Sequence, residues 1–356
     1  MSEDSTQFSG TMEVRERHKF NIDALATYLN SNIAGFSGPL EVSQFKGGQS
    51  NPSYLLTTPN RKYVLRRKPP GKLLPSAHAV DREYRVISAL ARTDVPVPKT
   101  YCLCEDESII GTIFYVMDFV DGDIEWDPSL PNYSKANRVA VFDSMNAAMA
   151  ALHSVDYKAV GLETFGKPTD YLARQINRWT KQYRASETEQ IEAMDKLMDW
   201  LPENIPAGDE TTIVHGDYRL DNTVLDKETH RVTAILDWEL ATLGHPLADF
   251  SYHCMTWRLE PNLFRGLNGL DLPALGIPTE EQYVKAYCER TGRDSIENWD
   301  FYAAYNMFRL AAILQGIVGR VKDGTASNKN AADVAVRVEP LAMRGWEQAE
   351  KIINNN

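Results

Sequence analysis

Cysteine is scarce in this sequence, and so are long apolar runs and an excess of positive charge. The four cysteines are too few for a disulfide framework, and a lone CxC pair, Cys102 and Cys104, is weak evidence for a metal site. We therefore expect reduced, structural thiols. If the pair lies in a strand, its two side chains share one face of the sheet.

No apolar run approaches the roughly 20 residues that a membrane-spanning helix requires, so no membrane segment is predicted. Residues 1–4 are polar and acidic, and no apolar stretch of a secretory signal follows them. Together these absences predict a cytoplasmic protein. The formal net charge of −11 argues against nucleic-acid binding, which usually shows a basic excess. The acidity fits a cationic substrate and ordinary surface solubility equally well, so it leaves the ligand open.

The sequence contains enough hydrophobic residues to form two lobes, each with its own hydrophobic core. Its 356 residues are 43% hydrophobic and 24% charged, which is ordinary for a globular protein. Asp23 is the expected N-cap of a first helix, and an amphipathic helix is expected over residues 79–92. Short strand-like runs, bounded by Gly, Pro and Asn, surround that second helix. The predicted strands are residues 40–45, 53–58, 63–66 and 112–119.

After residue 121 the pattern becomes mainly helical. Apolar positions at helical spacing predict helices over residues 137–153, 170–183, 187–201, 280–291, 299–321 and 331–354. Short strands are expected at residues 212–215, 222–225 and 232–236. The sequence thus predicts an α+β fold with a small antiparallel β-sheet lobe over residues 1–120 and a larger helical lobe over residues 121–356. A ligand cleft is expected where the lobes join.

One segment carries an ordered set of polar side chains between short predicted strands. It reads VHGDYRLDN at residues 214–222 and ILDW at residues 235–238. An Asp follows a His by two positions, an Asn follows that Asp by five, and a second Asp lies fifteen further on. A protein-kinase-like site places its catalytic base and two magnesium ligands in this order. A turn before a strand would explain the first segment alone, and a strand end would explain the second alone. The presence of both segments in this order favours a catalytic site.

Each polar residue of this segment can be given a role in phosphoryl transfer. Asp217 is the candidate base, because a carboxylate can orient an acceptor hydroxyl and take its proton. Arg219 is placed to stabilise charge on the transferred group. Asn222 and Asp237 offer the oxygen ligands that Mg²⁺ requires. His215 is expected to brace the loop and not to react.

Candidate nucleotide-binding residues lie upstream. Gly47, Gly48, Ser50 and Asn51 belong to a Gly-rich turn between two predicted strands, where backbone amides can approach phosphates. The turn lacks the G-x-G-x-x-G spacing, and an ordinary hairpin would look the same.

Two further features complete the predicted nucleotide site. Arg66 ends a strand where a kinase carries its phosphate-pairing Lys, and Glu83 on the next helix is its expected partner. A solvated basic strand end is the alternative. Backbone groups near Asp118 and Val120 are expected to pair with adenine while Met117 packs beside it. A buried strand without a ligand would have the same sequence.

At these residues the sequence resembles the aminoglycoside phosphotransferase and choline kinase superfamily, which has a protein-kinase-like bilobal fold. His215, Asp217, Asn222 and Asp237 match the HGD…N and D-W elements of that family, which imply the base and the metal ligands. The resemblance extends from residue 40 to the last helix. Trp238 follows the metal Asp, and no APE element or activation loop is recognisable. A small-molecule acceptor is therefore favoured over a protein.

A narrower resemblance is carried by residues 65–78, 171–179 and 308–317. These segments look like the phosphotransferase-like domain at the N-terminus of some acyl-CoA dehydrogenases, with the dehydrogenase domain expected to be missing here. The resemblance implies phosphorylation of the hydroxyl of a hydroxyacyl-CoA. Two groups of cations could then contact the phosphates of CoA, or they could be exposed to solvent without a ligand. The first group is the basic run at residues 66–72. The second group is Arg174, Arg178 and Lys181.

Three functions remain open from the sequence. The first is an ATP- and Mg²⁺-dependent O-phosphotransferase for a small-molecule hydroxyl, such as that of a CoA thioester, with GTP as another donor. The second is an aminoglycoside or amino-alcohol kinase, which needs carboxylates such as Asp249, Glu239 or Glu260 to meet ammonium groups, although Asp249 is rather expected to brace the HGD segment. The third is a nucleotide-binding pseudokinase, disfavoured because the base and metal ligands are intact. The sequence does not determine the oligomeric state.

Overall fold

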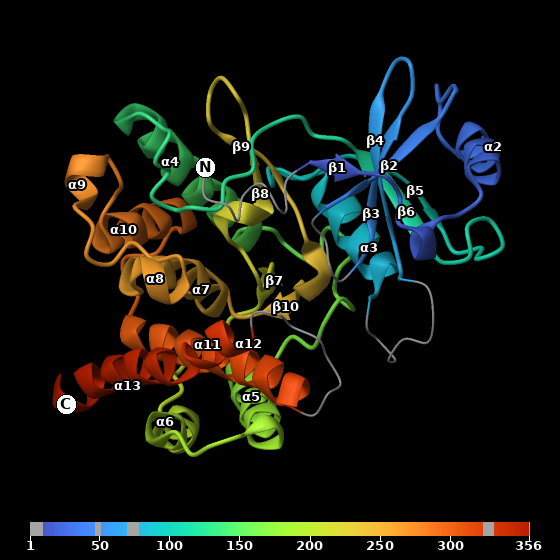
Figure 1. Cartoon of the computed structure of the whole chain (residues 1–356). Helices are drawn as coiled ribbons and strands as arrows, with labels where there is room; N and C mark the ends of the chain where they lie inside the picture. The colour runs from blue at the N-terminus through green and yellow to red at the C-terminus, as the bar shows by residue number, and fades with distance from the viewer. Residues whose placement is uncertain (1–9, 47–50, 70–77, 323–330, 356) are drawn as a thin grey trace. The chain divides into compact units, whose positions relative to one another are not determined.

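The computed structural model describes residues 10–46, 51–69, 78–322 and 331–355 of the chain. Packing groups the chain into two compact units, each assembled from separate stretches (Figure 1). Unit 1 combines Met1–Trp126, Tyr157–Phe165 and Leu220–Ala241, and unit 2 combines Asp127–Asp156, Gly166–Arg219 and Thr242–Asn356. This grouping follows packing and not chain continuity, so the predicted lobes over residues 1–120 and 121–356 stay a prediction.

Unit 1 is built on an antiparallel sheet of six strands in the order β1-β2-β3-β4-β6-β5. Four of these strands were predicted as short strand-like runs bounded by Gly, Pro and Asn. The two-residue β1 and the strand that holds the CxC pair were not predicted as strands. The strands are β1 (Thr11–Met12), β2 (Glu41–Phe45), β3 (Ser53–Thr57), β4 (Lys62–Arg67), β5 (Thr100–Cys104) and β6 (Phe114–Asp118).

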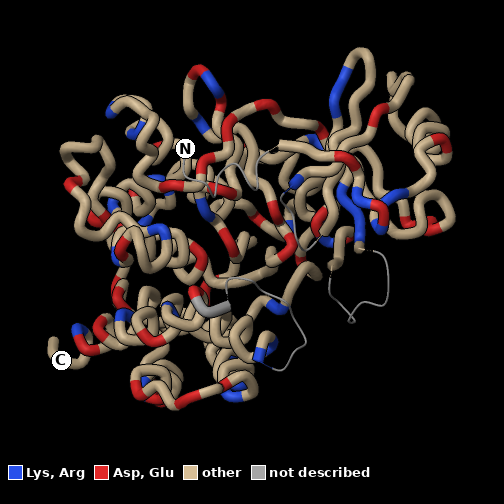
Figure 2. Tube along the Cα trace, viewed as in Figure 1, with Lys and Arg blue, Asp and Glu red and all other residues tan. Residues whose placement is uncertain are grey.

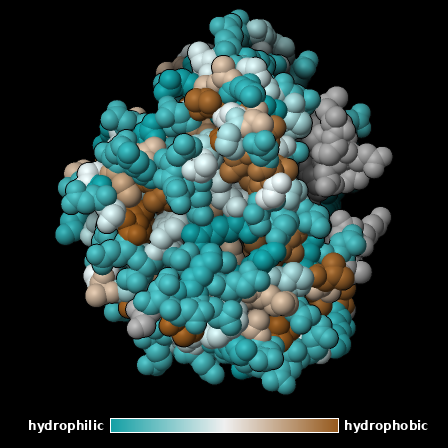
Figure 3. All heavy atoms as spheres, turned by 90° about the vertical axis from the view of Figure 1, so that its left-hand side faces the viewer, coloured by the Kyte–Doolittle hydropathy of each residue, from teal (hydrophilic) through white to brown (hydrophobic). Residues whose placement is uncertain are grey.

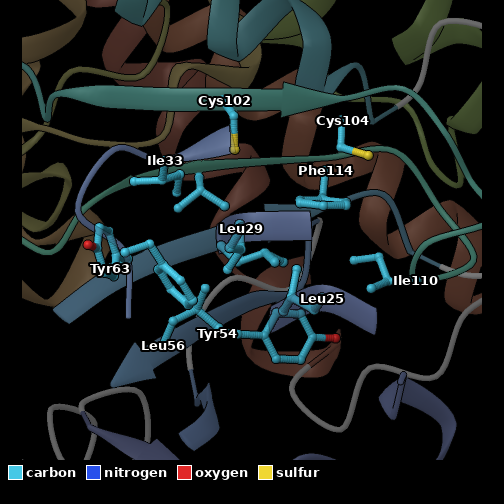
Figure 4. Close-up of a cluster of buried hydrophobic side chains, with 13 residues drawn as sticks. Leu25, Leu29, Ile33, Tyr54, Leu56, Tyr63, Cys102, Cys104, Ile110 and Phe114 are labelled. Atoms are coloured by element: carbon cyan, nitrogen blue, oxygen red, sulfur yellow. The ribbon is translucent and has the colours of Figure 1, made fainter. Parts of the chain in front are cut away.

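One face of this sheet forms an apolar core with helix α2 (Ile22–Asn32), as Figure 4 shows. Alternate residues of the strands point into the core, since side chains of a strand alternate between its faces. Cys102 and Cys104 share this face, as expected, and all four cysteines are free and buried. The core residues labelled in Figure 4 are Leu25, Leu29, Ile33, Tyr54, Leu56, Tyr63, Cys102, Cys104, Ile110 and Phe114.

The other face of the sheet meets helix α3 (Val80–Leu90), which confirms the helix predicted over residues 79–92. Arg66 and Tyr115 are opposite one another in the β4–β6 register and both contact this helix. The expected N-cap of α2 was wrong by two positions. The Asn21 side chain accepts the Ala24 N–H at 3.0 Å, and Asp23 lies in the first turn.

Unit 2 is mainly helical and centres on α11 (Trp299–Lys322), which packs against α5, α6, α7 and α13 (Figure 1). A two-stranded antiparallel ladder pairs β7 (Thr212–Val214) with β10 (Thr242–Gly244). The combination of antiparallel sheet and helices confirms the predicted α+β, protein-kinase-like class. The other helices are α4 (Lys135–His153), α5 (Tyr171–Ser186), α6 (Glu192–Glu203), α7 (Pro246–Arg258), α8 (Pro261–Phe264), α9 (Leu272–Leu275), α10 (Glu280–Thr291), α12 (Ala331–Ala335) and α13 (Val338–Asn355).

Several helix boundaries differ from the predictions for physical reasons. The helix expected from residue 187 starts at Glu192, because Glu187 has extended backbone at the C-terminus of α5. The helix expected over residues 331–354 is divided into α12 and α13. Helix α7 was not predicted at all. Its residues are buried around nearly the whole circumference, so no apolar stripe with a period of 3.6 is visible in the sequence.

Charged residues of both signs are interspersed along the chain (Figure 2). On the face drawn in Figure 3, hydrophilic residues cover most of the surface, and apolar residues form small separate groups. No helix of the described ranges has the length and apolar character to cross a membrane.

Candidate active site

In unit 2, the HGD loop (residues 215–219) follows directly after strand β7. One buried carboxylate pins its backbone. Asp249 of α7 accepts the N–H groups of His215 at 2.7 Å and of Gly216 at 2.8 Å. Gly216 has φ +84°, a left-handed conformation that favours glycine. The loop conformation is therefore set by a local glycine and by a helix more than 30 residues downstream.

The negative charge of Asp249, which holds the HGD loop, is stabilised by neighbouring residues of unit 2. Burial alone would raise the pKa of Asp249, but the hydrogen bond and charge of His153 and the charge and backbone N–H of His215 outweigh it, so the pKa is lowered. His153 Nε2 lies 3.3 Å from Asp249, and its Nδ1 lies 2.7 Å from the Tyr287 hydroxyl. Asp249 therefore remains a carboxylate, and it braces the loop as the sequence suggested.

Tyr252 and Arg219 contact the candidate base. The Tyr252 hydroxyl donates to Asp217 Oδ1 at 2.6 Å, and Arg219 Nε lies 3.2 Å from the same oxygen. Burial raises the pKa of Tyr252 above its usual value, so the phenol stays a donor. The Asp217 N–H donates to His215 Nδ1 at 3.2 Å, which gives His215 the bracing position expected for it. The Asp217 side chain remains 23% exposed.

Helix α11 adds a cation behind the same loop. Arg309 is buried and donates from Nη2 to the Gly216 carbonyl at 2.6 Å. Its guanidinium also lies 4.9 Å from the centroid of the Tyr252 ring. Arg309 thus contacts both the backbone before Asp217 and the tyrosine that donates to Asp217.

The candidate metal ligands lie in unit 1, at the base of the hairpin of β8 (Thr223–Leu225) and β9 (Val232–Ile235). Asn222 precedes β8, and Asp237 follows β9. The Asn222 carbonyl accepts the Leu236 N–H at 2.8 Å, so the hairpin brings the two predicted ligands to neighbouring positions. Asp237 has φ +63° and ψ +61°, a strained conformation for a residue with a side chain.

An amide oxygen and a carboxylate are a donor set that fits Mg²⁺, which is usually bound through one or two carboxylates together with phosphates and water. The described residues contain no cluster of three or more His, Cys, Asp or Glu suited to a metal. Asn222 and Asp237 supply one amide oxygen and one carboxylate of the kind that Mg²⁺ binds.

Asp237 also belongs to a group of charges around Arg66, which we call the Arg66 cluster (Arg66, Glu83, Asp237 and Glu239). Arg66 Nε lies 2.9 Å from Glu83, and its Nη2 lies 2.5 Å from Asp237 and 3.7 Å from Glu239. Three carboxylates thus surround one buried cation. Burial raises the pKa of Glu83 to about 7, Arg66 opposes this shift, and the two other carboxylates add to it. Asp237 is therefore paired with a cation within unit 1.

Of the residues predicted in the Gly-rich turn that would bind the nucleotide, the structure describes Asn51. Gly47, Gly48 and Ser50 lie outside the described residues. Asn51 is buried, donates to Glu83 Oε1 at 2.8 Å and lies 3.0 Å from His78 Nδ1, so it belongs to the support of Glu83.

Asp118, at the end of β6, makes hydrogen bonds to other residues of unit 1 with both its side chain and its backbone N–H. The Asp118 carboxylate accepts hydrogen bonds from Arg61 at 2.8 Å and Tyr101 at 2.7 Å, and its N–H donates to the Lys99 carbonyl at 2.8 Å. Met117 is buried on the same strand. A role for residues 117–120 in binding adenine stays a prediction.

Sequence reasoning missed Tyr252 and Arg309 as members of the site. Tyr252 lies on the helix that was not predicted. Local signals for that helix do exist, since Pro246 stands in its first turn and the His245 side chain accepts the Leu247 N–H at 3.2 Å as a cap. No local signal links Arg309 to the loop, because the two are 93 positions apart.

A small antiparallel sheet with an Arg–Glu pair, a pinned HGD loop and an Asn–Asp pair at a hairpin base define the class of protein-kinase-like phosphotransferases. Comparison with known proteins agrees with this class. The chain belongs to the phosphotransferase enzyme family, whose model matches residues 41–305. The predicted kind of enzyme, an aminoglycoside phosphotransferase-like phosphotransferase, is confirmed at this level.

Individual relatives refine the placement. Acyl-CoA dehydrogenase family member 10 of Mus musculus is 47% identical over 344 residues, which are 96% of this chain and 32% of that protein. The chain spans between about a third and a half of the length of the curated relatives it matches. The resemblance to the phosphotransferase-like domain of acyl-CoA dehydrogenase family proteins is thereby confirmed.

Solved structures extend the likeness. A candidate aminoglycoside phosphotransferase from Ralstonia eutropha JMP134 is 56% identical, with a TM-score of 0.88, covering 94% of this chain and 99% of that one. A thermostable mutant of aminoglycoside phosphotransferase APH(4)-Ia, solved with AMP-PNP and hygromycin B, has a TM-score of 0.58 at 19% identity, covering 90% of this chain and 98% of that one. The second likeness concerns the fold alone.

Proposed function

We propose that the chain is an ATP- and Mg²⁺-dependent small-molecule kinase that transfers the γ-phosphoryl group to a substrate hydroxyl, with a hydroxyacyl-CoA as acceptor. The observation that carries this proposal is the setting of Asp217. It is a partly exposed carboxylate on a loop whose backbone is held by Asp249 and Arg309. Phosphoryl transfer depends on such positioning more than on covalent chemistry by the protein.

In the proposed reaction Asp217 accepts a hydrogen bond from the acceptor hydroxyl and takes its proton as the oxygen bonds to phosphorus. The hydrogen bond from Tyr252 fixes the carboxylate in one orientation. Arg219 lies beside the same carboxylate, where its guanidinium can stabilise negative charge on the transferred group. Asn222 and Asp237 would hold Mg²⁺, which supplies charge neutralisation for the donor phosphates when bound.

Support for ATP as donor comes from the fold relative that was solved with AMP-PNP. The Arg66–Glu83 pair adds to it, because protein kinases place a cation and a helix carboxylate in this relation to hold the donor phosphates. Use of GTP and a cytoplasmic location stay predictions from the sequence.

The choice of acceptor rests on two observations. The first is the high identity to acyl-CoA dehydrogenase family proteins over nearly the whole chain. The second is that the carboxylates proposed to meet an ammonium group are already used. Asp249 binds backbone amides, Glu239 belongs to the Arg66 cluster, and Glu260 is paired with Arg344. This use of the carboxylates argues against an aminoglycoside or amino-alcohol acceptor.

A mass-spectrometric screen tests the function. The protein is incubated with Mg²⁺ and ATP or GTP and with hydroxyacyl-CoAs, aminoglycosides or amino alcohols. We expect a gain of one phosphoryl group on a hydroxyacyl-CoA with ATP. Phosphorylation of an antibiotic or amino alcohol with no product from any thioester would contradict the proposed acceptor.

The role of the base is tested by Asp217→Asn. We expect turnover to fall by roughly a thousandfold or more, because the acceptor loses its proton acceptor while the loop keeps its anchors. Calorimetry should show nucleotide affinity close to that of the wild type. Asp199→Asn, on the exposed side of α6, is the matched control and should turn over normally. Turnover of Asp217→Asn within about twofold of the wild type would remove Asp217 from this role.

A further inference from the structure

Helix α5 of unit 2 has an apolar face and a basic face. The basic face carries Arg174, Arg178 and Lys181 at spacings of four and three, which places them on one side of the helix. We call these three residues the α5 cation face. Basic residues on α5 are visible in Figure 2. The opposite side packs into the unit through Leu172, Ile176, Trp179 and Tyr183.

Among the residues that the structure describes, no carboxylate forms an ion pair with the α5 cation face. The next turn of the same helix differs, since Arg184 pairs with Glu187 at 3.1 Å and with Asp195 at 2.7 Å. The chain has 49 acidic and 38 basic residues, so carboxylates are not in short supply. Arg174 donates to the Lys167 carbonyl at 2.9 Å, while its buried Nη1 has no hydrogen-bond partner within the described ranges. A cluster of cations left unpaired in an acidic protein is suited to an external anion.

The surface over this face is hollowed. A solvent-open hollow of about 540 Å³ is lined by the three cations and by two amide side chains, Asn177 and Gln182. Guanidinium groups bind phosphate oxygens in a bidentate manner, an ammonium adds a point charge, and amides add further donors. The lining thus has the donors that a phosphate or diphosphate group requires, and among the described residues no carboxylate belongs to it.

Side-chain contacts within unit 2 connect this face to the HGD loop. Two cations contact the Trp179 ring, with the Arg178 guanidinium 5.3 Å and the Arg309 guanidinium 5.9 Å from its centroid. Arg309 in turn donates to the Gly216 carbonyl and lies over Tyr252. Two ring contacts therefore separate the α5 cation face from the residues that hold Asp217. A ligand seated on the face is within the part of unit 2 that presents the base.

We propose that the α5 cation face binds phosphate groups carried by the acceptor itself, so that the enzyme selects hydroxyl substrates attached to a phosphate-bearing nucleotide carrier. This inference rests on the proposed function and deepens it, because it assigns recognition to the carrier and not to the acyl chain. An uncharged or cationic acceptor, such as an aminosugar, would gain nothing from the site. Because the contacts are charged and solvent-open, binding weakens as ionic strength rises.

A binding experiment tests the site without turnover. Adenosine 3′,5′-bisphosphate is titrated calorimetrically into the full chain while Mg²⁺ and AMP-PNP at saturating concentration occupy the donor site. We expect binding to the wild type and a loss of affinity of about tenfold or more in the double variant Arg178→Gln, Lys181→Gln, since two charge-assisted contacts are removed. Lys285→Gln, an exposed lysine on α10, is the control and should bind as the wild type does.

The outcomes that overturn the site are specific. No binding by the wild type, or equal affinity in the double variant, would remove the α5 cation face as an anion site. Pyrophosphate is titrated in parallel to separate a carrier from a free anion. If pyrophosphate binds as tightly as the bisphosphate, the face is a site for a free phosphate anion, and its assignment to the acceptor fails.

A kinetic arm links the site to selection of the acceptor. KM is measured for a hydroxyacyl-CoA and for the same hydroxyacyl group on N-acetylcysteamine, which lacks phosphates. The ratio of the second KM to the first should fall about tenfold in the double variant and keep its wild-type value in Lys285→Gln. An unchanged ratio contradicts the inference. If no thioester is phosphorylated at all, the proposed acceptor fails, whereas the calorimetric titration still decides whether the face binds the bisphosphate.

Discussion

In unit 1, Arg66 is the cation that contacts the buried carboxylate of Glu83 and the carboxylates of Asp237 and Glu239. Its planar guanidinium reaches Glu83 through Nε and Asp237 through Nη2, two directions that a lysine ammonium does not offer in fixed geometry. In the sequence, Arg66 is followed directly by two more basic residues, Arg67 and Lys68. A solvated basic strand end was therefore the alternative interpretation. The structure places Arg66 in the interior, with the pairing to Glu83 that the kinase-like layout predicts.

Arg66→Met tests this dependence. The variant leaves Glu83 buried without its cation, and breaking a buried pair from one side usually costs about 3–5 kcal/mol of unfolding free energy. Urea unfolding measures the loss. Adding Glu83→Gln to Arg66→Met should recover part of it, because the unpaired charge is then gone. A double variant no more stable than Arg66→Met alone would show that the pair is not the source of the loss.

Tyr252 is a positioning residue for the candidate base. Tyr252→Phe removes the 2.6 Å hydrogen bond to Asp217, and hydrogen bonds to charged groups contribute about 1.5–3 kcal/mol. We expect kcat to fall about 10- to 100-fold with the acceptor KM within about twofold, measured by steady-state kinetics. Tyr305→Phe on α11 is the matched control, since the Tyr305 hydroxyl has no partner among the described residues. A rise in KM at constant kcat would instead place Tyr252 in substrate binding.

At the scale of elements, α7 supports the HGD loop through Asp249 and Tyr252, and it also buries a histidine. Burial lowers the pKa of His253 to about 4, and its Nε2 lies 2.8 Å from the Tyr283 hydroxyl. Because the folded pKa lies below the unfolded value of 6.5, the unfolded chain takes up the proton first as the pH falls. The contribution of neutral His253 to stability is therefore complete above pH 6.5 and is lost towards pH 4.

This shift predicts a pH-dependent difference between the wild type and His253→Asn. Between pH 6.5 and 4 the unfolding free energy of the wild type should fall by about 3 kcal/mol more than that of the variant, from 1.36 kcal/mol per pKa unit. Urea unfolding at pH 7, 5.5 and 4 measures both curves. Parallel curves would mean that another group sets the acid sensitivity of this helix.

Sequence patterns predicted elements unevenly, and the reason is burial. Residues of β3 alternate between buried and partly buried positions, whereas β4 and β6 are buried at nearly every position and stand out in the sequence as short apolar runs. Helix α5 shows an apolar stripe because one side is exposed. Helix α7 is buried nearly all round, so its sequence carries no period to detect. The element that contributes most to the HGD loop was thus the hardest to predict.

At the scale of the whole molecule, nucleotide binding should appear as added stability. A ligand that binds only the folded state stabilises it by about 2.7 kcal/mol at a hundredfold excess over Kd. We expect Mg²⁺ with AMP-PNP to raise the Tm of the wild type, and Asp237→Asn to lose most of the Mg²⁺-dependent part of that rise. Differential scanning calorimetry with and without Mg²⁺ measures the effect.

Glu228→Gln is the matched control for this experiment, because it changes an exposed carboxylate of the same β8–β9 hairpin. It should keep the wild-type Tm shift. An Asp237→Asn protein with the full Mg²⁺-dependent shift would remove Asp237 from the metal site.

The sequence by itself determined the order and chemistry of the HGD…N…D residues, most of the sheet strands and the family. These features are local, since turns, strand alternation and motif spacing act over a few neighbouring residues. Apart from the Arg66–Glu83 pair, which the kinase-like layout predicted, tertiary structure decided which charged residues form ion pairs. Tyr252 reaches Asp217 across 35 positions and Arg309 reaches Gly216 across 93, while the α5 cation face remains without carboxylate partners in the described ranges. Burial and ion pairing depend on what packs nearby, and no local pattern encodes that.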